Sequence, residues 1–164
     1  SNGPEEYLRK EYAIRVNGYD SMMVNVDPEK QIPSGYNQLN LLQKIRFKPH
    51  EHLDINYGFH FSTTTNVPRY DRLIVYRENF LREGEWYYGP QKWMMQSVIL
   101  NIKEISKAFD RQATTLAYQY FEESRHSRRF DNTILTHRTE KVRVLSMRSS
   151  FEQTISENLL ISYC

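Results

Sequence analysis

The segment from Leu53 to Ser62 alternates strictly between two kinds of side chain. Its odd-numbered positions are all apolar or aromatic, and its even-numbered positions are all polar or glycine. A helix cannot place a period of two on one face, whereas a β-strand does so by construction. A slightly interrupted alternation runs from Leu39 to Phe47, and a short polar stretch around Pro49 joins the two segments. The sequence therefore predicts a β-hairpin here and an all-β fold for the chain.

Weaker alternation elsewhere predicts about four more strands and a doubtful one near residues 12–16. We expect a single domain over residues 1–164, folded as an antiparallel up-and-down meander of about six or seven strands. The strands are expected at roughly 36–48, 52–63, 92–103, 112–122, 140–152 and 157–164. Long loops are expected at 17–35, 64–91 and 123–139.

Long and short connections alternate along this predicted meander. Outer-membrane barrels sort their connections in this way, with short turns on the periplasmic side and long loops outside. Expected strand lengths of about ten residues also fit the ~9–11 residues of a tilted membrane strand. A half-buried sheet in a soluble protein would alternate too, so both interpretations stand. The loop lengths favour the first, in which the chain is part of a transmembrane β-barrel.

Composition excludes several classes of function. The 164 residues include 22 Lys and Arg against 20 Asp and Glu, a balance that does not favour nucleic acid as a partner. The single cysteine, Cys164, cannot form a disulfide within the chain. The sequence has no phosphate-binding glycine-rich loop, no serine nucleophile elbow and no His-Glu-x-x-His pair. We therefore expect no enzyme activity, no cofactor and no metal site.

The predicted loop at 64–91 is the most distinctive part of the chain. Two stretches, 66–73 and 85–93, interleave Trp, Tyr and Arg with acidic residues, and Trp, Tyr and Arg dominate the hot spots of binding surfaces. Alternatively, these side chains pack on one another and order the loop. The candidate ligand-binding residues are Arg69, Tyr70, Asp71, Arg72, Trp86, Tyr87 and Tyr88.

The expected role of the other polar residues depends on which face of a strand they occupy. In a barrel, the apolar face of each strand would meet lipid and its polar face would line the lumen. His50 and His52 could bind a metal from their turn, but a solvated turn is the simpler reading. The basic stretch 122–130 is expected to be a solvated extracellular loop or to contact anionic lipopolysaccharide. The candidate lumen-facing residues are Lys44, Arg46, Asp54, Asn56 and His60.

Several stretches resemble one known family. Residues 66–73 (NVPRYDRL) and 85–93 (EWYYGPQKW) resemble the barrel of TonB-dependent outer-membrane receptors, most closely those of the Bacteroidota type and the haem or haemoglobin receptors. Residues 42–49 and 53–58 are similar to the hairpin before that loop, and 115–119 with 122–125 resemble the strand and loop after it. The resemblance covers most of the chain from about residue 36 onward.

This resemblance implies an outer-membrane location and import of an iron chelate, haem or a similar scarce nutrient. It implies a plugged barrel of about 22 strands, with the plug domain and the other strands expected outside this sequence. The implied partners are the TonB complex, acting through the plug, the small nutrient ligand and outer-membrane lipid. The alternative is a self-contained soluble antiparallel β domain that binds a ligand or protein through its aromatic 64–93 loop.

Overall fold

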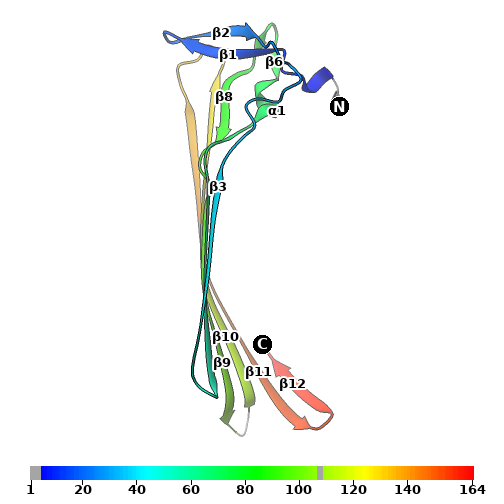
Figure 1. Ribbon diagram of the computed structural model, residues 1–164, viewed down its shortest axis with the longest axis vertical. Helices are drawn as coiled ribbons and strands as arrows, with labels where there is room; N and C mark the ends of the chain where they lie inside the picture. Colours follow the sequence, from blue (N-terminus) through cyan, green and yellow to red (C-terminus); the bar gives the residue numbers. More distant parts are fainter. Residues whose placement is uncertain (1–4, 107–108) are drawn as a thin grey trace. The chain divides into compact units, whose positions relative to one another are not determined.

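The structure is a computed structural model that describes residues 5–106 and 109–164 (Figure 1). Strands make up 70% of the chain and helices 4%, and the sheets are antiparallel. This confirms the all-β, antiparallel prediction; that the strands belong to a transmembrane barrel stays a prediction. No helix among the described residues has the length and apolar character needed to cross a membrane.

The long strands form one sheet in the order β12-β11-β10-β9-β4-β3, so each lies beside the long strand that precedes or follows it in the chain. Sheet neighbours that follow one another in sequence are what a meander requires. Short strand β8 also pairs with β10 in this sheet. The five long strands are β3 (Gln38–His50), β4 (Leu53–Thr64), β9 (Lys92–Ser106), β10 (Phe109–Arg129) and β11 (Thr136–Ser156), and the shorter β12 (Leu159–Tyr163) follows them.

Short elements occupy the N-terminal part and the segment between β4 and β9. β1 and β2 form a separate two-stranded sheet, and so do β6 and β7. The short elements are the 3-10 helix η1 (Glu5–Tyr7), β1 (Glu11–Val16), β2 (Tyr19–Val24), β5 (Val67–Pro68), α1 (Tyr70–Leu73), β6 (Tyr76–Arg77), β7 (Phe80–Leu81) and β8 (Glu83–Tyr88).

The structure corrects three predicted loops. The segment 17–35 contains β2, which pairs along its length with β1. The segment 64–91 holds four short strands and one helical turn. The segment 123–139 is mostly strand, because β10 continues to Arg129 and β11 begins at Thr136. The prediction missed this strand because its side chains are polar on both faces, and the alternation of apolar and polar residues identifies only strands with one apolar face.

Contacts divide the chain into two compact units. Unit 1 consists of Ser1–Leu39, Thr63–Gln91 and Glu122–Glu140, and unit 2 of Asn40–Ser62, Lys92–Phe121 and Lys141–Cys164. Among the described residues only two large hydrophobic residues are buried, Leu73 and Leu81. Both belong to unit 1, where the segment between β4 and β9 packs on itself. Unit 2 is built from β12 and the larger part of each long strand, while the remaining residues of β3, β4, β10 and β11 belong to unit 1.

Candidate functional site

One face of unit 2 carries the predicted lumen-facing residues. Arg46 on β3 donates hydrogen bonds from Nε and Nη2 to the Asp54 carboxylate on β4, at 2.5–3.1 Å. Asn56 donates to the same carboxylate at 3.2 Å. The ring of His60 lies edge-on to the Trp93 ring of β9, with centroids 4.6 Å apart. Two-residue spacing places Lys44 on the same face as Arg46, so the structure brings these predicted residues to one side of the sheet.

The same face continues across β9, β10 and β11. A hollow of about 360 Å³ is lined by polar side chains from five strands. Ser150 of β11 donates to the Ala113 carbonyl of β10, which ties the last two of these strands together. The charged and polar side chains around the hollow are Arg46, Lys48, Glu51, His52, Asp54, Asn101, Lys103, Arg111, Gln112, Ser150 and Glu152.

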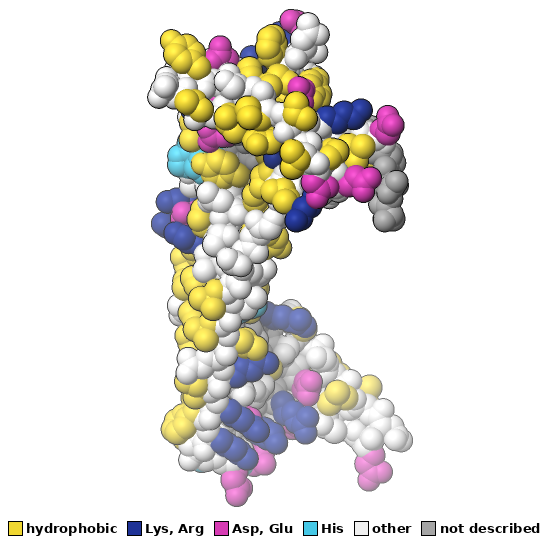
Figure 2. Space-filling view, turned by 45° about the horizontal axis from the view of Figure 1, so that its top comes forward, with side chains coloured by type: hydrophobic (Ala, Val, Ile, Leu, Met, Phe, Trp, Pro, Cys, Tyr) yellow, Lys and Arg dark blue, Asp and Glu magenta, His cyan; other side chains and the backbone are white. Residues whose placement is uncertain are grey.

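The opposite face of unit 2 is apolar. Because side chains alternate along a strand, the residues between those of the hollow point to the other side. Several of them are widely exposed, including Phe47 at 61%, Leu145 at 79% and Met147 at 69% of their surface. Figure 2 shows hydrophobic side chains running along one side of this part of the sheet, with Lys and Arg side chains gathered beside them. Residues on the apolar face are Phe47, Ile55, Tyr57, Phe59, Val98, Leu100, Leu116, Tyr118, Leu145 and Met147.

In unit 1, four of the predicted ligand-binding residues meet around Arg69. Its guanidinium forms two hydrogen bonds of 2.7 Å with Asp71 and one of 3.0 Å with the Tyr88 hydroxyl. It also lies over the rings of Trp86 and Tyr88, 5.3 and 5.5 Å from their centroids. The hydrogen bonds that Arg69 donates to Asp71 raise the pKa of Arg69 and hold the pKa of Asp71 below its usual value. These side chains therefore pack on one another, and a binding role for them stays a prediction.

The other three predicted residues lie elsewhere. Tyr87 points to the opposite face of β8, where its ring stacks on His126 at 4.6 Å. Burial and the neighbouring His137 lower the pKa of His126. Tyr70 donates a 2.6 Å hydrogen bond to the Tyr7 carbonyl. Arg72 lies 3.6 Å from Asp71 and lines a separate cleft.

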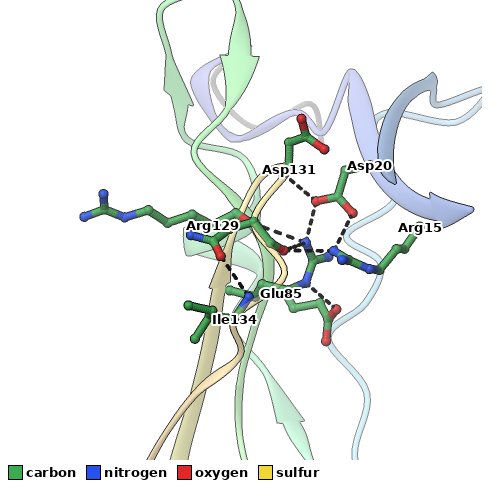
Figure 3. A network of polar contacts seen from close by, with 8 residues as sticks. Arg15, Asp20, Glu85, Arg129, Asp131 and Ile134 are labelled. Atoms are coloured by element: carbon green, nitrogen blue, oxygen red, sulfur yellow. Dashed lines mark hydrogen bonds and ion pairs between the residues drawn. The ribbon is translucent and has the colours of Figure 1, made fainter. Parts of the chain in front are cut away.

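Sequence reasoning missed a buried ion pair in unit 1. Arg128 of β10 has a side chain only 4% exposed, and its partner Asp20 of β2 is fully buried. Arg128 donates from Nη1 to Asp20 at 2.5 Å and from Nε to Glu85 of β8 at 2.8 Å. The backbone N–H of Asp131 donates to the same Asp20 carboxylate at 2.7 Å. Figure 3 shows how this network joins the hairpin β1–β2 to β8 and β10.

A glycine makes room for the network. A methyl group at Gly84 would lie 2.7 Å from Arg128 Nη2 and 2.9 Å from Asp20 Oδ2. Since Cβ atoms do not approach other heavy atoms this closely, any other residue at position 84 must displace one of the two ions. The partners lie 108 residues apart in the sequence, so neither local periodicity nor composition could have paired them.

The acid sensitivity of this network can be predicted. Burial raises the pKa of Asp20, but hydrogen bonds from Arg128 and Asp131 and the charges of Arg128 and Arg15 outweigh it, so the pKa is lowered overall. A carboxyl whose pKa is lower in the folded chain than its unfolded value of ~3.9 stabilises the fold above that value. That stabilisation is lost as the pH falls through the folded pKa.

We therefore expect unit 1 to lose stability as the pH falls below about 4. The measurement is the unfolding midpoint followed by tryptophan fluorescence between pH 7 and pH 3. Other carboxylates also titrate in this range, so the control is Asp20→Asn, which removes only this group. A wild-type midpoint with the same pH dependence as that of Asp20→Asn would contradict the prediction.

Comparison with known proteins identified no relative of this chain. No family model matches the chain, and searches of curated proteins and of solved structures found no similar chain. Within residues 5–106 and 109–164, no three His, Cys, Asp or Glu side chains lie together in a way that could hold a metal ion. The functional argument therefore rests on the two faces of unit 2 and the side-chain clusters of unit 1.

Proposed function

We propose that this chain is a segment of the barrel of a TonB-dependent outer-membrane receptor that takes up an iron chelate, haem or a similar scarce nutrient. The observation that carries the proposal is the two-faced sheet of unit 2. In lipid, an apolar outer face and a polar inner face are what a transmembrane strand requires. β4 contributes residues 53–62 to unit 2, which agrees with the ~9–11 residues of a tilted membrane strand.

The exposure of the apolar face supports this reading. A soluble monomer rarely leaves apolar patches larger than a few hundred Å² in contact with water. Leu145 and Met147 on β11 and Phe47 on β3 are each more than half exposed. Hydrocarbon chains of a bilayer would cover such side chains and remove the cost of exposing them to water.

The edge of the apolar face has the chemistry of a membrane interface. Arg143 of β11 lies over the Tyr120 ring of β10, with 5.9 Å between the guanidinium carbon and the ring centroid. Tyr118 lies two residues along the same strand face as Tyr120. Tyrosine rings concentrate at the level of the lipid headgroups, and basic side chains bind the anionic groups there.

In this proposal the polar face of unit 2 lines the barrel interior, and the Trp, Tyr and Arg side chains of unit 1 contact the ligand. Energy for import comes from the TonB complex, which acts through a plug domain. No covalent step is needed, since capture and release of the nutrient are binding events.

The test is to refold the 164-residue chain in plain buffer, in detergent micelles and in phospholipid vesicles. We expect β-sheet circular dichroism and a defined sedimentation coefficient only with detergent or lipid, and aggregation in buffer, because the apolar face requires hydrocarbon. An ordered monomer in buffer would contradict the proposal and favour a soluble β domain that binds through its 64–93 segment.

A further inference from the structure

Unit 1 contains a cleft with a large excess of positive charge. The cleft has a volume of about 670 Å³, within the ~300–1,000 Å³ typical of small-molecule sites. Trp86 forms an aromatic part of its wall. Its charged lining residues are Arg72, Arg82, Arg125, Arg129, Arg138 and Glu83.

Strand pairing explains why these side chains converge. In the β8–β10 pair, Arg125 lies opposite Tyr88, Ser127 opposite Trp86, and Arg129 opposite Glu83. Residues directly opposite on antiparallel strands share a face. Arg128, between Ser127 and Arg129, points to the other face and into the buried network with Asp20. In Figure 3, the Arg129 side chain extends away from that network.

Two carboxylates lie within ion-pair distance of cleft arginines, Asp71 beside Arg72 and Glu83 beside Arg82, and they leave an excess of positive charge. Asp71, the neighbour of Arg72, is held by two hydrogen bonds from Arg69. Glu83 lies 3.3 Å from Arg82 Nε, but without hydrogen-bond geometry, since this buried nitrogen has no hydrogen-bond partner. The buried Nε of Arg125 also has none.

The remaining two arginines of the cleft form no ion pair with a described residue. Among residues 5–106 and 109–164, no carboxylate lies within ion-pair distance of Arg129 or Arg138. Like charges held close together repel, and a buried N–H without a partner costs free energy. A bound anion would reduce the repulsion between the arginines and would accept hydrogen bonds from their unpaired N–H groups.

We propose that this cleft binds a small molecule with two or more carboxylate or phosphate groups. The planar guanidinium matches both groups with paired N–H donors, and several arginines in one cleft fit a multivalent anion better than a single charge. The Trp86 ring supplies an apolar contact beside them. That this anion is the ligand of a receptor rests on the proposed function. The binding of the anion to the cleft does not depend on a membrane.

The experiment measures binding of citrate and of pyrophosphate to the refolded chain by calorimetry at about 0.15 M salt. Acetate is the control with one charge, and vesicles containing phosphatidylglycerol test a lipid headgroup as the source of the phosphate. We expect saturable binding of citrate or pyrophosphate and none of acetate. Binding to the vesicles alone would overturn the proposal of a small soluble ligand.

Paired variants test the site. Arg129→Gln with Arg138→Gln should weaken the binding roughly tenfold or more, since each removes charge-assisted hydrogen bonds. Lys30→Gln with Arg77→Gln removes the same charge from exposed positions outside the cleft and should change the affinity less than about twofold. The pair of Arg→Lys changes at 129 and 138 keeps the charge and should give an intermediate loss.

Each outcome separates this inference from the proposed function. Equal losses in the cleft and control variants would show nonspecific attraction and overturn the site. No binding by a chain that folds only in lipid would overturn the site and leave the receptor proposal in place. Binding by a chain that is an ordered monomer in buffer would support the site and contradict the receptor.

Discussion

Replacing Arg128 by methionine is expected to destabilise unit 1 by about 3–5 kcal/mol, the usual cost of removing one partner of a buried ion pair. The side chain of Asp20 is fully buried, and Arg128 is its main partner. Without the guanidinium, the carboxylate stays buried with only the Asp131 N–H and the weaker contact of Arg15, 3.4 Å away. Glu85 loses its partner as well. The hairpin β1–β2 is then expected to lose its attachment to β8 and β10.

The measurement is a denaturant titration of the refolded chain followed by fluorescence, together with hydrogen exchange of the β1–β2 amides. Arg15→Met is the matched control, because Arg15 also contacts Asp20 but its side chain is 29% exposed. Because the Arg15 contact is longer, at 3.4 Å, and its guanidinium is partly exposed, its loss should cost less than the loss of Arg128. Equal effects of Arg15→Met and Arg128→Met would contradict the assignment of Arg128 as the central ion.

If Arg128→Met fails to fold, the double variant Arg128→Met with Asp20→Asn can be used to measure the stability of unit 1 without the ion pair. Removing both charges should recover part of the stability, because the loss comes largely from the uncompensated carboxylate rather than from the missing contact. A double variant no more stable than Arg128→Met would indicate that the network acts through packing alone.

The strands of unit 2 were predictable because one face of each is apolar. The alternation from Leu53 to Ser62 predicted a strand at 52–63, and the structure has β4 at Leu53–Thr64. The strands predicted at 140–152 and 157–164 correspond to β11 at Thr136–Ser156 and β12 at Leu159–Tyr163. Local sequence contains this information because the side-chain period of a strand does not depend on its partners.

The structure of unit 1 was not predictable by the same reasoning. In the segment 122–129, polar residues occupy both faces, since one face lines the arginine cleft and the other supplies Arg128 and His126 to buried contacts. Without an apolar face, the strand has no periodic signal. β2 was missed for a related reason, because its conformation depends on pairing with β1 and its Asp20 is buried only by a distant arginine.

The sequence predicted which residue types form the candidate site but not which of their side chains lie together. The mixture of Trp, Tyr and Arg in 64–93 identified the right segment of the chain. Which side chains share a face depends on the pairing of β8 with β10, which sets Trp86 beside the cleft and Tyr87 against His126. Arg82 and Arg138 lie in stretches with no distinctive pattern, so only the fold could bring them to the same cleft.

Phe59→Lys is expected to impair insertion into a bilayer, whereas Asn56→Lys is expected to be tolerated. Position 59 lies on the apolar face of β4, and position 56 lies on the opposite face, where Asn56 bonds to Asp54. A lysine facing lipid near the midplane of the bilayer costs about 2–4 kcal/mol. On the polar face, the same side chain meets water and a carboxylate. Phe59→Leu, which keeps the position apolar, should insert as well as the wild type.

The measurement is the fraction of refolded chain that floats with phospholipid vesicles and resists added protease. Both lysine variants add one charge to the same strand of the same sheet, so a difference between them reports the face and not the net charge. Equal tolerance of the two variants would show that neither face of β4 meets lipid. Greater loss with Asn56→Lys would reverse the assignment of the faces, and the hollow around Arg46 and Asp54 would then have to lie on the outer surface.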